Sequence, residues 1–257
     1  MRHISFSEMK TWTECPYKHK LNYINRVRKF VGNEFTAFGK AVHNLCENAM
    51  LGTIVESEFE DFFDENFENE ILSLAGEEID LKLVEQMSLQ ARNLYPLIIP
   101  GVQNTFGDYE VVSTEEKLYE DISDFDKEDF KFKGFIDLVI KTSDGKYHII
   151  DWKTCSWGWD AKKRTDKILT YQLTLYKKYF CAKHNIDPSK VETHFALLKR
   201  TAKKNNVEIF RVTSGDRKTR NASALLNKAL HNICVGNFIK NRSSCDRCEF
   251  RKTKHCK

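Results

Sequence analysis

Residues 131–154 read KFKGFIDLVIKTSDGKYHIIDWKT, in which two apolar, β-prone runs flank a Thr-Ser-Asp-Gly turn. This composition predicts a β-hairpin. If residues 143–145 form a three-residue turn, the resulting register places Asp137 directly opposite Asp151. Side chains alternate along a strand, so Lys153 then lies on the same face as Asp151. The hairpin thus predicts two carboxylates and one ammonium group on a single face of a sheet.

These three side chains favour a catalytic site over a structural one. Two carboxylates that face each other across a sheet repel unless a cation lies between them. Buried charge is costly unless it is paired or bound to a metal. The neighbouring side chains are apolar, namely Phe135, Ile136, Val139, Ile149 and Ile150. A salt bridge between Asp151 and Lys153 at the rim of a sheet is the structural alternative, but the trio predicts a metal-dependent site that cleaves phosphodiester bonds.

The order of motifs along the chain resembles that of a known nuclease family. The segments GFID (134–137) and IIDWKT (149–154) resemble motifs II and III of the PD-(D/E)XK nuclease superfamily. The most similar branch is the RecB-like one, which includes nuclease domains of bacterial recombination complexes, CRISPR-adaptation nucleases and many phage exonucleases. Further segments of that branch are matched in the same order by Ser7, CPYKHKL (15–21), FGKAVH (38–43), QLTLY (172–176) and three cysteines near the C-terminus. The resemblance covers nearly the whole chain.

The resemblance implies an α/β fold in which helices flank a small mixed sheet. We expect one nuclease domain over residues 1–257. Its expected parts are N-terminal helices (1–50), an acidic helical insertion (51–105), the nuclease core (106–235) and a cysteine-rich cap (236–257). Individual helices are expected at about 5–23, 35–50, 165–184 and 217–235, with a second hairpin at 193–213. Pro100-Gly101 is expected to end the helical insertion.

A metal site follows from the same resemblance. His43 stands where the branch has its metal-binding histidine, although a lone histidine on a helix is commonly a packing or solvent-facing residue. Asp137 and Asp151 are expected to bind the same ion. Carboxylates and water suit Mg²⁺ or Mn²⁺, and an imidazole ligand biases the site towards Mn²⁺.

A further carboxylate is expected from the strand at residues 111–118, which matches the motif I strand. Strand alternation places either Glu115 or Glu116 inward, because each shares its parity with apolar neighbours. Periodicity therefore does not decide between them. The position in the family pattern narrowly favours Glu116.

Three more side chains are expected to serve the reaction. Lys153 is placed to orient or deprotonate the attacking water and to stabilise the charged transition state. Gln172 and Tyr176 are i,i+4 neighbours on one helix face. They resemble the pair that orders the site and the substrate strand in this branch, and ordinary helix packing is their alternative.

Four cysteines form a second constellation. Cys245, Cys248 and Cys256 are spaced like metal ligands, and Cys15 is the N-terminal candidate for a fourth. In the iron–sulfur members of the branch, one N-terminal and three C-terminal cysteines hold a [4Fe–4S] cluster that joins the two ends of the chain. Zn²⁺ is the general alternative for four cysteines, and His255 is an adjacent substitute ligand because the gap before Cys256 is longer than in the family pattern. The other four are expected to be small core residues, namely Cys46, Cys155, Cys181 and Cys234.

The charge is distributed unevenly along the chain. The net charge is +4, yet residues 51–159 carry nine Lys/Arg against 25 acids, and residues 160–257 carry 24 against eight. A basic region suits a phosphate backbone, although charge runs are commonly only solvated surface. The turn of the second hairpin is the most specific DNA-binding candidate, with Lys199, Arg200, Lys203 and Lys204.

These observations predict a metal-dependent DNA nuclease, most simply an exonuclease on single-stranded ends that works in replication, recombination or repair, with a helicase or recombination protein as a possible partner. The alternatives are a catalytically silent iron–sulfur or zinc nucleic-acid-binding module, a structure-selective endonuclease and an RNA nuclease. No apolar run approaches membrane-spanning length, and the N-terminus lacks a signal-peptide core. We therefore expect no membrane association and a cytoplasmic location, that of a host cell if the gene is carried by a phage.

Overall fold

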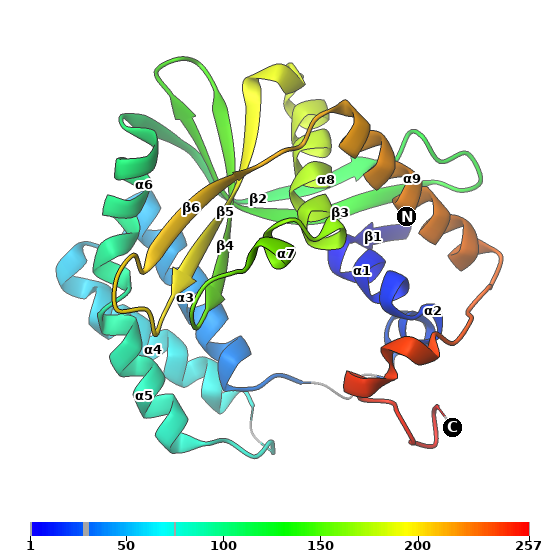
Figure 1. Cartoon of the computed structure of the whole chain (residues 1–257), viewed down its shortest axis with the longest axis horizontal. Coiled ribbons are helices and arrows are strands. Elements are labelled where there is room, and N and C mark those ends of the chain that lie inside the picture. The colour runs from blue at the N-terminus through cyan, green and yellow to red at the C-terminus, as the bar shows by residue number, and fades with distance from the viewer. Residues whose placement is uncertain (1, 28–30, 75, 257) are drawn as a thin grey trace.

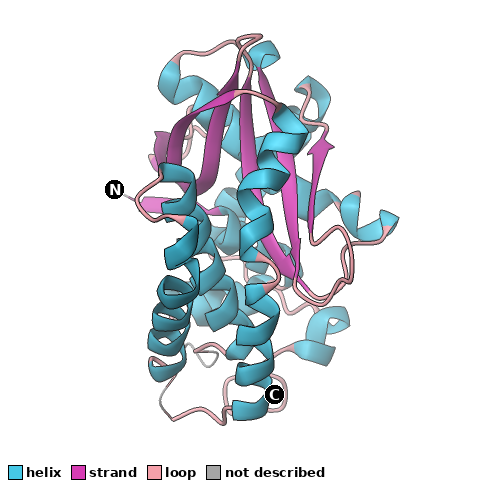
Figure 2. Cartoon of the chain, turned by 90° about the vertical axis from the view of Figure 1, so that its left-hand side faces the viewer, coloured by secondary structure: helices cyan, strands magenta, loops and turns pink. Residues whose placement is uncertain are grey.

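A computed structural model describes residues 2–27, 31–74 and 76–256. Six strands form one mixed sheet, and helices cover both of its faces (Figure 2). The expected α/β class is confirmed. The strands are β1 (Arg2–Ser5), β2 (Tyr109–Asp121), β3 (Phe130–Thr142), β4 (Tyr147–Cys155), β5 (Val191–Lys199) and β6 (Val207–Val212).

The β3–β4 hairpin has the predicted register. Leu138 pairs with Ile150, and Lys141 pairs with Tyr147. The Thr142 N–H donates to the Lys146 carbonyl at 3.0 Å, which closes the three-residue turn. This register is the one that places Asp137 at the level of Asp151.

Strand β3 is the centre of the sheet, and its partners divide it into two parts. The antiparallel strand β2 follows it over residues 131–142. On the other side, β1 pairs in parallel with residues 130–133 and β4 pairs with residues 138–141. Residues 134–137 lie between these two ladders, so Asp137 stands where β1 and β4 diverge. The remaining strands extend the sheet, because β5 runs parallel to β4 and β6 antiparallel to β5.

One face of the sheet is covered by the helices of the acidic region and the helix before it (Figure 1). These helices are α3 (Glu34–Leu51), α4 (Phe59–Leu72), α5 (Leu81–Arg92) and α6 (Ile98–Phe106), with short 3₁₀ turns at Glu56–Glu58 and Tyr95–Leu97. The aromatic residues of α4 face inward, since Phe59, Phe63 and Phe67 are buried. Their helical spacing is thus a packing pattern.

The expected helix end at Pro100-Gly101 is wrong, because α6 runs through both residues. Pro100 lies in the first turn of the helix, where an N–H has no acceptor within the helix and proline is tolerated. Gly101 packs against β6, and a Cβ atom there would lie 2.6 Å from Val207 Cγ1. This glycine serves a close helix–strand approach.

The other face of the sheet is covered by α1 (Phe6–Glu14), α8 (Lys167–His184) and α9 (Asp216–Cys234), with the short α7 (Ala161–Arg164) before α8 and a 3₁₀ turn at Pro188–Lys190. The expected helix at 5–23 is interrupted at Cys15, whose backbone is extended. Pro16 disfavours a helical conformation at Cys15 and begins α2 (Pro16–His19), which continues into a π-helical turn at Lys20–Ile24.

The C-terminal segment folds back to the N-terminal helices (Figure 1). It contains the 3₁₀ turn Arg242–Arg247. The Tyr17 N–H donates to the Ile239 carbonyl at 3.3 Å, and the Tyr17 hydroxyl donates to the His255 carbonyl at 3.2 Å. Among the described helices, none has the length and apolarity required to cross a membrane.

Candidate active site

Three ligand-type side chains converge at the split in the sheet. His43 comes from α3, Glu115 from β2 and Asp137 from β3, and one ligand atom of each lies within 4.8 Å of the others. His43 Nδ1 is 3.6 Å from Asp137 Oδ2. The same carboxylate oxygen accepts the Trp152 N–H at 2.7 Å, which fixes its orientation beside β4. An imidazole with two carboxylates is a donor set that suits Mn²⁺ or Mg²⁺.

The structure places Glu115, rather than the expected Glu116, beside His43 and Asp137. Glu116 shares its strand parity with the buried Leu118 and faces α8, where its carboxylate accepts from Lys183 at 2.5 Å and from His184 at 2.9 Å. Glu115 adopts a φ of +45°, which is uncommon for a residue other than glycine. The ladder with β3 also shifts register just before this segment. Simple alternation therefore does not hold on β2.

A second group adjoins the first on the α8 side of β4. Asp151 is 1% exposed, and its Oδ2 contacts the Lys153 ammonium group. Gln172 Nε2 donates to Asp151 Oδ1 at 2.8 Å and to the Tyr176 hydroxyl at 3.2 Å. The structure thus brings Asp151, Lys153, Gln172 and Tyr176 into one hydrogen-bonded group. Gly134 makes room for it, because a Cβ atom there would lie 2.8 Å from Tyr176 Cε1.

Burial and like charges shift the titration of these groups. Burial raises the pKa of both Asp137 and Asp151 to about 6, although Lys153 opposes the shift. Partial burial, and then the Asp137 and Glu47 carboxylates, raise the pKa of Glu115 to about 7. Burial and Lys153 lower the pKa of His43 to about 4, so its imidazole is neutral and able to bind a metal. A divalent cation would favour the ionised carboxylates, and the residues present therefore fit one.

Two hollows lie beside these groups, one lined by His43 and Glu115 and the other by Asp137. A cleft of about 690 Å³ lies over His43 and Glu115, and a hollow of about 460 Å³ lies between Asp137 and the start of α1. Each contains an exposed aromatic side chain, Phe35 (49% exposed) in the first and Phe135 (41% exposed) in the second. Sequence reasoning treated Phe135 as an apolar neighbour and did not single out Phe35. Their exposure depends on where β1 and α3 pack in the folded chain, and the spacing of residues along the sequence does not predict that packing.

The four basic residues of the second hairpin do not form one exposed patch. Lys199 is buried and pairs with Glu208 at 3.1 Å. The Arg200 guanidinium lies 5.4 Å from the centre of the ring of Phe35, which lines the larger of the two hollows. Lys203 and Lys204 are exposed. Only the last three are therefore placed to meet a nucleic acid.

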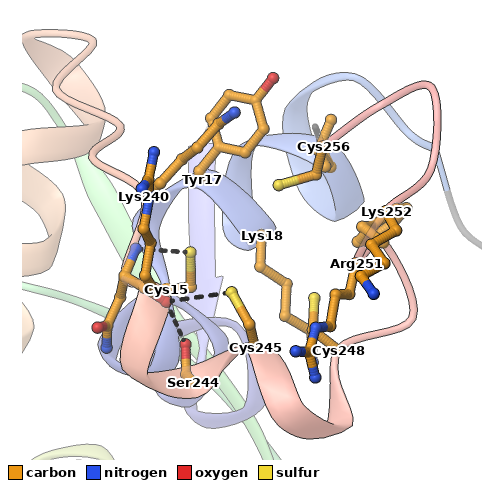
Figure 3. A pocket seen from close by; sticks show the side chains of 14 residues that line it. Cys15, Tyr17, Lys18, Lys240, Ser244, Cys245, Cys248, Arg251, Lys252 and Cys256 are labelled. Carbon is orange, nitrogen blue, oxygen red and sulfur yellow. Dashed lines mark hydrogen bonds between the residues drawn. The ribbon is translucent and has the colours of Figure 1, made fainter.

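The four candidate cluster cysteines line a single cavity of about 390 Å³ (Figure 3). Cys15 lies at the start of α2, and its Sγ accepts the Asn241 N–H at 3.3 Å. Cys245, Cys248 and Cys256 approach from the C-terminal segment. All eight cysteines of the chain are described, and none forms a disulfide. His255 does not line this cavity.

The remaining cysteines have the expected packing positions. Cys46 and Cys181 are buried, whereas Cys155 and Cys234 are half-buried and pack against the core on the α8 and α9 face of the sheet. None of these four lines the cavity at the chain ends.

Residues 3–253 match the family described as the PD-(D/E)XK nuclease superfamily. The chain belongs to this superfamily. Among solved structures, it is similar to a protein described as a proposed exonuclease from Eubacterium rectale, with 13% identity, a TM-score of 0.58, and 98% of this chain and 89% of that chain covered. It also matches the structure of SSO0001, with 13% identity, a TM-score of 0.45, and 97% and 84% of the two chains covered. No curated protein matches the sequence. Membership of this nuclease superfamily supports a DNA nuclease. At 13% identity, the likeness to the two solved structures concerns the fold alone.

Proposed function

We propose that this protein is a Mg²⁺- or Mn²⁺-dependent DNA exonuclease that acts on single-stranded ends. The observation that carries the proposal is the convergence of His43, Glu115 and Asp137 beside the Asp151–Lys153 pair. Among the described strands, this is the part of β3 that lies between its ladder with β1 and its ladder with β4. The bound cation would polarise the scissile phosphate and acidify a water ligand. If Glu115 and Asp137 served only in structural salt bridges, they would need a cationic partner, whereas the His43 imidazole beside them is neutral.

Each residue of the second group has a distinct role in this proposal. Asp151, which we propose also binds the cation together with His43 and Asp137, holds the Lys153 ammonium group at the floor of the site. Gln172 binds the other oxygen of Asp151 and so fixes the plane of that carboxylate. Lys153 then donates to the attacking water or to the phosphate oxygens as negative charge develops on them. Tyr176 accepts from Gln172 and holds its amide in place.

Single-stranded DNA fits the surroundings of this group. Unpaired bases bind proteins by stacking on aromatic rings within a basic groove. Phe35 and Phe135 expose their rings in the two hollows, and the Arg200 guanidinium lies 5.4 Å from the centre of the Phe35 ring. The similar structure from Eubacterium rectale, with its description as a proposed exonuclease, adds support for cleavage from an end.

We further propose that Cys15, Cys245, Cys248 and Cys256 hold a [4Fe–4S] cluster, as in the iron–sulfur members of the RecB-like branch. Tetrahedral zinc requires its sulfur ligands to lie about 3.8 Å apart. Among the described residues, no three of these four sulfur atoms lie within 4.8 Å of one another, so the cavity suits a larger group than one ion. Basic side chains around the cavity, including Lys18 and Arg251, complement the charge of the thiolates.

The deciding experiment uses protein purified without oxygen and incubated with Mg²⁺ or Mn²⁺ and labelled DNA. Linear single-stranded DNA should be degraded, whereas circular single-stranded DNA of the same sequence should stay intact. Asp151→Asn, which keeps the shape of the side chain, should leave the linear DNA intact as well. Cutting of the circle would show an endonuclease, and equal activity of Asp151→Asn would refute the active site.

A further inference from the structure

A second cluster of ligand-type side chains lies at the start of β4 and β5, outside the site described above. His148 is on β4, and Glu192 and His194 are on β5, where His148 pairs with Glu192 in the ladder. One ligand atom of each lies within 4.8 Å of the others. His148 is 7% exposed and His194 is 5% exposed. Two imidazoles with so little contact with solvent require partners for their nitrogen atoms.

Hydrogen bonding determines which nitrogen of His148 is free. The Thr142 hydroxyl donates its proton to Asp144 Oδ1 at 2.5 Å. Its oxygen is 3.1 Å from His148 Nε2, so it accepts the Nε2 proton. Nδ1 of the neutral ring then carries a bare lone pair. Within the part of the chain that the structure describes, this buried Nδ1 has no hydrogen-bond partner.

The other two side chains present comparable atoms. Glu192 Oε1 contacts Arg211 at 3.4 Å and Lys146 at 3.7 Å, whereas Oε2 is turned towards His148 Nδ1 at 4.0 Å. The His194 ring lies near the Ile149 carbonyl, and its buried Nδ1 makes no hydrogen bond of regular geometry among the described residues. A backbone carbonyl that accepts one ring N–H of a histidine leaves the other ring nitrogen free to bind a metal.

The surroundings reduce the exposure of this cluster and limit its charge. The Phe106 ring at the end of α6 lies 4.7 Å from the His148 ring and 5.0 Å from the His194 ring. Lys146 and Arg211 neutralise one oxygen of Glu192 and would oppose a further cation. Bonds from a metal ion to the imidazole nitrogens would have to be strong enough to offset that repulsion. Transition metals form such bonds, whereas Mg²⁺ and Ca²⁺ prefer oxygen ligands.

We propose that His148, Glu192 and His194 form a second metal site, which binds Zn²⁺ with water as the fourth ligand. Ligand atoms around tetrahedral zinc are about 3.4 Å apart, so small side-chain rotations close the set. The ion would join the starts of β4 and β5 beneath α6. This site is separate from the nuclease centre and from the cysteine cavity, and it stands whether or not either of those proposals holds.

The test counts zinc in the whole protein. Protein stripped with a chelator is titrated with Zn²⁺, and bound zinc per chain is measured after gel filtration. Wild type and His231→Ala, which alters an exposed histidine on α9, should bind one zinc per chain more than His194→Ala or Glu192→Gln. The cysteines and the nuclease centre are unchanged in all four proteins, so any zinc bound there is the same in each and does not affect the difference between them. Equal stoichiometry and affinity in the four would overturn the proposal.

A second pair of variants avoids the ligands and the risk of misfolding. Thr142→Val removes the acceptor that leaves His148 Nδ1 unprotonated, and it should weaken zinc affinity about tenfold. Thr142→Ser keeps the hydroxyl and should retain the wild-type affinity. Because Thr142→Val keeps the β-branched shape whereas Thr142→Ser loses a methyl group, a role of Thr142 in packing alone would weaken the serine variant more than the valine variant. Equal zinc affinity in the two variants would exclude His148 as an oriented ligand.

Discussion

Glu115 and Glu116 are adjacent and chemically identical, so exchanging each for glutamine separates a metal-site role from a structural one. Glu116→Gln loses charge-assisted contacts to Lys183 and His184. The partners are about one-third exposed, and such pairs contribute about 1 kcal/mol after screening by solvent. For a chain of this size, that loss lowers the melting temperature by about 2–4 °C. The variant should still cleave DNA at nearly the wild-type rate.

Glu115→Gln should have the opposite effects. It removes one carboxylate from the metal set and should lower the cleavage rate at least about a hundredfold, because a metal site supplies several kcal/mol to the transition state. Stability without metal should be preserved. The pKa of Glu115 is raised from 4.5 to about 7 in the fold, so the folded chain holds this proton more tightly than the unfolded chain does. The group's contribution to stability is therefore present below pH 4.5 and is lost as the pH rises towards 7. Without that carboxylate, the metal-free variant should lose less stability over this range than wild type.

Three measurements on both variants suffice: thermal melting with a chelator at pH 5 and pH 8, calorimetric titration with Mn²⁺, and cleavage of end-labelled single-stranded DNA. Glu115→Gln should melt like wild type at pH 8 or slightly above it, bind Mn²⁺ weakly and fail to cleave. An inactive Glu116→Gln together with an active Glu115→Gln would refute the assignment of the β2 ligand. It would also show that the left-handed backbone at Glu115 serves something other than the metal.

Other expected outcomes concern the lysines and the cysteines. Lys153→Ala should abolish cleavage while single-stranded DNA is still retained in a binding assay, because the side chain serves the reacting groups; cleavage at the wild-type rate would remove it from the site. Replacing Lys203 and Lys204 by alanine should reduce the slope of log affinity against log salt by about 1.4, the value for two phosphate contacts on a single strand, and an unchanged slope would place the DNA elsewhere. Cys245→Ser should bleach the brown colour of anaerobic protein and lower its melting temperature by about 10 °C or more, since the proposed cluster would close a loop of nearly the whole chain. Cys234→Ser is the matched control and should do neither, and a colourless wild type with stoichiometric zinc would refute the cluster.

The part of the site on β4 and α8 could be predicted because each step was local. A turn of fixed length sets the register of the hairpin, and alternation then sets the face of Asp151 and Lys153. The i,i+4 spacing of Gln172 and Tyr176 puts both on one helix face. The structure indeed joins these four residues by hydrogen bonds and an ion pair.

The features that sequence reasoning missed depend on tertiary contacts. On β2, a register shift and a left-handed residue break the alternation that would have decided between Glu115 and Glu116. At Pro100-Gly101, the usual signal for a break coincides with the first turn of a helix that packs closely on Val207. A propensity is overridden wherever burial against a distant element contributes more free energy than the local preference does.

The position of β1 links the chain ends to the proposed active site. This strand holds β3 by only the four residues Arg2–Ser5, and the segment after it, including Ser7, forms one wall of the hollow beside Asp137. A strand of four residues is weakly held by its own ladder. Cys15 follows at the end of α1, so a group bound by the cysteines would fasten the far end of the same segment. A group bound in the cysteine cavity would therefore hold in place the segment that borders the proposed active site, where β1 and β4 diverge. A cluster bound there would stabilise the wall against which we propose that a DNA strand lies, without contributing a side chain to the reaction.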